Sequence, residues 1–243
     1  MFRARGMQED TRSMTPEQGE TPFASVQRPR PLPVLVLADV SGSMTEHGKI
    51  QSLNLAIASM VRALARERSP RGEINIGVIT FGGRGVALHQ RPAPASSATW
   101  ADMEAVGGPD GTPMGDAFET ARQVLDDEEM IPARAYDVTL VLISDGRPTS
   151  EWRPQLDRLL SSERGARSLR LAVAIGPETG SAAYRVLESF VGDPLYPVVR
   201  AEEADRIPEI FKYLTQSMSI RVNSARPDDA SVFDPGELAD LSD

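Results

Sequence analysis

Short apolar runs alternate along this chain with segments in which apolar residues recur every three or four positions. The clearest run is residues 138–143 (VTLVLI), and residues 34–38 and 73–81 are also rich in Val, Ile and Leu. Runs of this kind are typical of strands buried on both faces of a sheet. Helical segments between such strands imply right-handed crossovers. The pattern therefore predicts an α/β chain with a mostly parallel sheet between two layers of helices.

Further patterns complete the expected order of elements. We expect one antiparallel edge strand at residues 86–90 and two more strands at residues 169–175 and 196–199. A weaker pattern at residues 100–106 predicts a short helix. The main helices are expected at residues 50–64, 114–125, 152–160, 182–190 and 208–220.

The predicted elements belong to a single domain, residues 31–221, with a polar segment on each side. Residues 1–30 lack apolar periodicity and are expected to be disordered. Residues 222–243 form an acidic C-terminal tail that is expected to have little structure alone. The tail has six acidic residues against one arginine and so carries −5 of the net charge of −9.

Composition excludes several classes of function. The chain has no cysteine and two histidines, so thiol chemistry and His- or Cys-based metal sites are excluded, and any metal site must use oxygen ligands. The net charge of −9 argues against nucleic-acid binding. No apolar stretch approaches the length of a membrane span, and the N-terminus lacks the apolar core of a signal peptide. We therefore expect a cytoplasmic protein that binds neither nucleic acid nor membrane.

Three loops carry the residues that point to chemistry. The first follows the strand at residues 34–38, the second precedes the helix at residues 114–125, and the third follows the strand at residues 138–143. Their side chains are expected to meet at the carboxyl edge of the sheet, where ligands of such folds bind. Hydroxyl and carboxylate oxygens suit Mg²⁺ or Mn²⁺, with Ca²⁺ the less favoured ion. The candidate metal-site residues are Asp39, Ser41, Ser43, Thr112 and Asp145.

The sequences DVSGSM, INIGVITF, GGPDGTPMGDAF and VLISDGRPT together resemble von Willebrand factor A domains. The resemblance implies a Rossmann-like, doubly wound fold and a metal-ion-dependent adhesion site. It implies that Ser41, Ser43 and Thr112 ligate the ion, Thr112 directly or through water, and that Asp39 and Asp145 mostly hold coordinating waters. Such a domain binds an acidic residue of a protein partner and does not catalyse a reaction.

Within this family, RPLPVLVLADVSGSM and VLISDGRPTSEW resemble the bacterial TerY-like proteins. That resemblance implies a role in tellurite resistance or stress. It also implies a serine/threonine kinase or a PP2C-type phosphatase as the partner. Some relatives have a cysteine-rich zinc segment at the C-terminus, which this cysteine-free chain lacks.

The alternative is a metal-dependent hydrolase or phosphatase that uses the same oxygen ligands. Phosphatases of the haloacid dehalogenase type need a second aspartate at the position of Ser41, and no lysine is expected near a matching strand end. A serine nucleophile would need a histidine base, and His47 is the nearest in sequence. P-loop and dinucleotide-binding motifs are absent. The sequence therefore predicts no catalytic residue.

Overall fold

The computed structural model of the chain describes residues 29–193, 196–229 and 234–240. Its centre is a six-stranded sheet in the order β3-β2-β1-β4-β5-β6. Four of the five strand pairs are parallel, and β3 is an antiparallel edge strand beside β2. The predicted fold class is confirmed. The strands are β1 (Arg30–Asp39), β2 (Gly72–Gly82), β3 (Gly85–Pro94), β4 (Thr139–Ser144), β5 (Leu169–Ile175) and β6 (Val199–Ala201).

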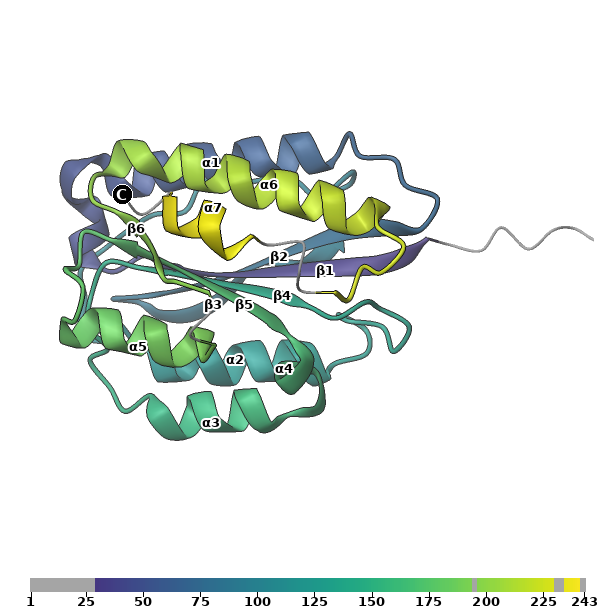
Figure 1. Cartoon of the computed structure of the whole chain (residues 1–243). Coiled ribbons are helices and arrows are strands. Elements are labelled where there is room, and N and C mark those ends of the chain that lie inside the picture. The colour runs from purple at the N-terminus through teal and green to yellow at the C-terminus, as the bar shows by residue number, and fades with distance from the viewer. Residues whose placement is uncertain (1–28, 194–195, 230–233, 241–243) are drawn as a thin grey trace, which may run out of the picture.

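Helices cover both faces of this sheet, as Figure 1 shows. One layer contains α1 (Lys49–Leu64), α6 (Ile207–Asn223) and the short α7 (Pro235–Asp240). The other contains α2 (Met114–Asp126), α3 (Arg153–Ser161), α4 (Glu163–Arg167) and α5 (Ala182–Val191). Two 3₁₀ helices, η1 (Gly42–Gly48) and η2 (Ala204–Arg206), precede α1 and α6.

β1 shows why the central strands are apolar at consecutive positions. Val34 and Val36 belong to the core beneath α1 and α6, whereas Leu35 and Leu37 belong to the core over α2 and α5. Successive side chains of a strand point to opposite faces, so a strand between two helical layers buries every position. Within the described residues, no helix is long and apolar enough to cross a membrane.

The chain changes direction across the sheet between β1 and β4. It passes from β1 outward through β2 to β3, and then crosses to β4 on the other side of β1. Ala38 pairs with Ile143 in this parallel ladder, which brings the ends of β1 and β4 to the same level. This switch point is where doubly wound folds bind ligands. Asp39 and Asp145 therefore emerge side by side at the carboxyl edge.

Two predicted elements differ from the structure. Residues 100–106 form no helix, because Asn54 of α1 holds the backbone of Met103 through two hydrogen bonds of 2.9 Å that replace helical ones. The last strand is Val199–Ala201, not residues 196–199. There the Tyr184 hydroxyl donates to the Val198 carbonyl at 3.2 Å, so a side chain engages this backbone before the strand begins.

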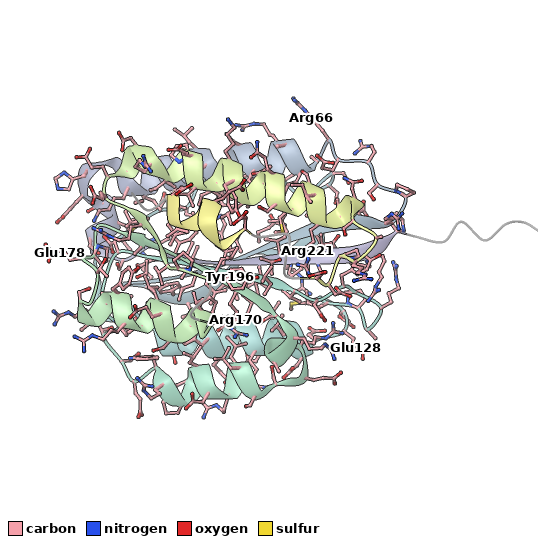
Figure 2. All side chains as sticks on the ribbon, viewed as in Figure 1. Arg66, Glu128, Arg170, Glu178, Tyr196 and Arg221 are labelled. Carbon is pink, nitrogen blue, oxygen red and sulfur yellow. The ribbon has the colours of Figure 1, made fainter. Side chains whose placement is uncertain are left out.

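The start of β1 and the chain directly after α6 lie at the edge opposite the switch point, where Arg30 pairs with Asp228. Residues 1–28 of the segment predicted to be disordered lie outside the described residues. In the acidic tail, α6 continues to Asn223, and α7 lies within residues 222–243. Figure 2 shows Arg221 of α6 reaching toward the sheet. Its guanidinium donates to Thr139 Oγ1 at 2.5 Å, to the Asp137 carbonyl at 2.6 Å and to the Pro227 carbonyl.

Candidate metal site

Asp39, the last residue of β1, has a carboxylate enclosed by protein. The residue is 0% exposed. The Ser41 backbone N–H donates to Oδ1 at 2.8 Å, and the Ser144 hydroxyl donates to Oδ2 at 2.5 Å. Burial raises the pKa of Asp39 to about 6, against the opposing effect of these hydrogen bonds, and nearby Asp145 adds to the rise. Asp39 thus joins the loop after β1 to the end of β4.

Ser41, Ser43 and Asp145 form a connected group beside this anchor. The Ser41 and Ser43 hydroxyl oxygens are 3.2 Å apart, and Ser43 donates to Asp145 Oδ1 at 2.6 Å. Lys49, the first residue of α1, donates from Nζ to Asp145 Oδ2, also at 2.6 Å. The Asp145 side chain is 0% exposed. Its two oxygens therefore have different partners, a neutral hydroxyl and a cation.

Thr112 approaches from the loop before α2. Gly111 precedes it at φ 58°, a backbone conformation that favours glycine. The Thr112 N–H donates to Thr149 Oγ1 at 3.0 Å, and that hydroxyl donates to the Asp110 carbonyl at 2.8 Å. The Thr112 carbonyl accepts from the Thr149 N–H at 3.1 Å. These bonds tie the Thr112 loop to the loop after β4 and fix its position.

Gly146 leaves open the space that the hydroxyls face. A Cβ at this position would lie 3.7 Å from Thr112 Oγ1 and 3.9 Å from Ser43 Oγ. Both hydroxyls therefore border one small volume. The φ angle of Gly146 is outside the left-handed region, so glycine provides room here and not an unusual turn.

All five predicted site residues lie at the switch point. Hydrogen bonds link Asp39, Ser41, Ser43 and Asp145, and Thr112 borders the same space beside Gly146. Ser144 and Lys49 complete the cluster, and neither was predicted from the sequence. The expectation that no lysine lies near a matching strand end is wrong, because α1 begins beside the carboxyl edge and Lys49 reaches Asp145. The signal for Ser144 was its place directly before Asp145, which turns its side chain to the opposite side, toward Asp39.

The donor chemistry of this cluster fits a hard divalent cation. It consists of carboxylate and hydroxyl oxygens, which Mg²⁺ and Mn²⁺ accept. Among residues 29–193, 196–229 and 234–240, no group of three or more His, Cys, Asp or Glu side chains is arranged to hold a metal. A metal at the switch point would thus rely on the three hydroxyls as well as the two carboxylates. The room beside Gly146, where an added Cβ would make only ordinary contacts, is consistent with a cation there.

A surface pocket of about 540 Å³ adjoins the cluster through Lys49. Ile175 at the end of β5 and Ala204 after β6 lie in its wall, so the pocket belongs to the same carboxyl edge. Its charged lining residues are Lys49, Glu202, Glu203 and Asp205, with His47 beside them. The cluster is therefore bordered by a hollow large enough for side chains of another molecule.

Comparison with known proteins shows what this chain is similar to. Residues 34–147 match the model of the von Willebrand factor type A domain, a segment that contains all five predicted site residues. This segment is just under half of the chain, and over it the chain is similar to von Willebrand factor type A domains. A comparison with curated protein sequences finds no match.

Solved structures share the fold of this chain. A von Willebrand factor type A structure from Catenulispora acidiphila has a TM-score of 0.57 at 16% identity, over 79% of this chain and 43% of that one. The proximal thread matrix protein 1 of the mussel byssus, described with a zinc-occupied MIDAS motif, has a TM-score of 0.57 at 16% identity, over 77% and 48%.

The pilus adhesin SpaC of Lactobacillus rhamnosus GG, in its open conformation, has a TM-score of 0.59 at 13% identity, over 81% of this chain and 31% of that one. At these identities the likeness concerns the fold alone. The chain spans less than half of the length of each of these three proteins.

Proposed function

We propose that this von Willebrand factor type A domain is a metal-dependent protein-interaction module. Its ion is Mg²⁺ or Mn²⁺, and its ligand is an acidic residue on the surface of a partner protein. The observation that carries the proposal is the meeting of Ser41, Ser43 and Thr112 beside Asp145 at the switch point. The zinc-occupied MIDAS motif of the mussel protein, which shares the fold, adds support.

The proposed roles follow from the chemistry of the side chains. Ser41, Ser43 and Thr112 hold the ion through neutral hydroxyl oxygens, Thr112 directly or through water, whereas Asp39 and Asp145 hold waters around it. Neutral ligands leave most of the ionic charge uncompensated, so the bound ion supplies a Lewis-acidic position for a carboxylate. Asp39 already accepts two hydrogen bonds, which suits an orienting role.

The proposal assigns binding and not catalysis to this cluster. A phosphatase of the haloacid dehalogenase type needs a carboxyl group two residues after the first aspartate, and Ser41 cannot supply one. Lys49 does not replace that proton donor, because its ammonium is engaged with Asp145. His89, on the edge strand β3, contacts the Ala101 carbonyl at 2.8 Å, so this ring nitrogen is engaged.

The cellular setting is the further part of the proposal. From the resemblance of the sequence to TerY-like proteins, we take the setting to be a bacterial stress response of the tellurite-resistance kind. The partner would be a serine/threonine kinase or a PP2C-type phosphatase in the cytoplasm.

Capture from native lysate tests the proposal. The baits are the wild-type chain, Asp39→Ala and Ser43→Ala, with Ser59→Ala on the exposed face of α1 as the matched control, each in Mg²⁺ and in EDTA. The wild type and Ser59→Ala should retain a partner in Mg²⁺ alone. The two site variants should lose it, because each removes an oxygen of the ion's surroundings.

Identical captured proteins in every lane would contradict the proposal, since binding would then use another face. The hydrolase alternative is tested on the same samples with p-nitrophenyl phosphate. Mg²⁺-dependent turnover that Asp39→Ala abolishes would favour that alternative.

A further inference from the structure

Lys49 places a positive charge inside the proposed metal site. Its Nζ lies 2.6 Å from Asp145 Oδ2 and 3.4 Å from the Ser43 carbonyl. The Lys49 side chain is 16% exposed and the Asp145 side chain 0%. This ion pair is therefore shielded from most of the water and salt that weaken surface pairs.

The ion pair changes what Asp145 offers to a metal. Oδ1 accepts the Ser43 hydroxyl, and Oδ2 accepts the Lys49 ammonium, so each oxygen is engaged. The charge of Asp145 is also neutralised by a cation on the same carboxylate. An ion bound at Ser43 therefore gains little attraction from Asp145. It is also repelled by the Lys49 ammonium, which lies on the other oxygen of the Asp145 carboxylate.

The choice of lysine at this position is unusual for this chain. Of its 26 basic residues, two are lysines, Lys49 and Lys212, and the others are arginines. An arginine would present a planar fork able to bind both oxygens of a carboxylate. Lysine presents a compact charge that takes one oxygen and leaves the other to Ser43.

We propose that Lys49 is a positioning residue that weakens the binding of the ion alone and makes ion capture depend on the partner's carboxylate. The inference rests on the proposed function and assigns to Lys49 the regulation of that same site. The ion and the partner's carboxylate then bind with positive coupling. The partner's carboxylate supplies negative charge in place of the Asp145 charge that Lys49 neutralises. The domain would hold its ion firmly when an acidic partner is present.

Calorimetric titration with Mg²⁺ tests the first half of this inference. The Lys49→Met chain keeps the apolar stem but loses the charge, and should bind Mg²⁺ about tenfold more tightly than the wild type. Lys212→Met, which removes the other lysine from the exposed face of α6, is the matched control. Its Mg²⁺ affinity should stay within about threefold of the wild type.

Acetate serves as the carboxylate probe for the second half. Mg²⁺ titrations are repeated in sodium acetate and in sodium chloride of equal ionic strength. Acetate should strengthen Mg²⁺ binding to the wild type by a larger factor than to Lys49→Met. Equal factors in the two chains would overturn the coupling that we infer.

Two measurements keep the test independent of misfolding. Circular dichroism in EDTA shows whether Lys49→Met is folded. In the wild type, ¹³C-labelled lysine gives two side-chain signals, which Lys212→Met assigns. The Lys49 signal should shift on addition of Mg²⁺ while that of Lys212 does not, and an unmoved Lys49 signal would overturn the inference.

Failure of this inference is distinguishable from failure of the proposed function. A wild-type chain that binds no Mg²⁺ overturns both. A wild-type chain that binds Mg²⁺, with a folded Lys49→Met chain that binds it equally or more weakly, overturns the role of Lys49 alone.

Discussion

Asp39 is a carboxylic acid whose burial favours its neutral form. Burial raises its pKa to about 6 from the ordinary value of 3.8. The folded chain therefore binds this proton more tightly than the unfolded chain. The contribution of Asp39 to stability is fully present below pH 3.8 and is lost as the pH rises through about 6. At neutral pH the ionised group costs about 3 kcal/mol, which a bound cation would offset.

Replacing Asp39 by asparagine tests this cost. In EDTA at pH 8, Asp39→Asn should have a free energy of unfolding about 1–3 kcal/mol higher than the wild type, because asparagine carries no charge to desolvate. The advantage should shrink toward zero at pH 4. Urea denaturation of both chains at the two pH values measures it. A variant that is less stable than the wild type at pH 8 would contradict the account.

Gly146 is the residue whose missing side chain the metal site requires. In Gly146→Ala the new methyl group would make ordinary contacts with the Thr112 and Ser43 hydroxyls, so the fold should tolerate it. The methyl group would also occupy the space that the ion and its waters need. Mg²⁺ affinity should fall at least about tenfold, whereas the free energy of unfolding in EDTA should change by less than about 0.5 kcal/mol.

Gly107→Ala is the matched control for this change. A Cβ on Gly107 would have no atom within 4 Å, so this variant should bind Mg²⁺ like the wild type. Calorimetric titration of the three chains gives the comparison. Equal Mg²⁺ affinities in all three would place the ion elsewhere.

At the scale of elements, hydrogen bonds from Arg221 hold α6 against the sheet at the edge opposite the metal site. Arg221 is 2% exposed and donates to groups on β4, on the segment before it and on the chain after α6. Burial lowers the pKa of Arg221, and the charges of Asp228 and Asp137 oppose that shift. This one side chain therefore ties the C-terminal residues to the amino end of β4.

Removing this guanidinium should separate stability from metal binding. Arg221→Met leaves Thr139 Oγ1 and two backbone carbonyls without their donor, so the free energy of unfolding should fall by about 3 kcal/mol. Mg²⁺ affinity should stay within about twofold, because the site lies at the other end of the strands. Arg226→Met, at an exposed position, is the control. Loss of Mg²⁺ binding by folded Arg221→Met would show that the two edges are coupled.

At the scale of the whole molecule, the layered fold was predictable because burial leaves a pattern in the sequence. β1 and β4 are apolar at consecutive positions since each is covered on both faces, and their order with helices between them implies parallel pairing. Residues 100–106 were not predictable in the same way. Their conformation depends on Asn54, which is 49 residues away from Met103 in the chain.

The candidate site also contains residues that the sequence predicts and one that it does not. Asp39, Ser43 and Asp145 follow buried strands, so topology alone predicts that they meet. Lys49 has no such signal, because a lysine at the start of a helix is ordinarily a surface residue. Its pairing with Asp145 depends on where α1 begins relative to β4, which is a property of the packed molecule.

The central claim is that a divalent ion binds among Ser41, Ser43 and Thr112. The most direct measurement is an anomalous difference map from a crystal of this protein grown with Mn²⁺, collected near the manganese absorption edge. A single strong peak is expected beside Gly146, about 2.1 Å from the Ser41 and Ser43 hydroxyl oxygens. A map with no peak there, or with its strongest peak away from the switch point, would contradict the claim.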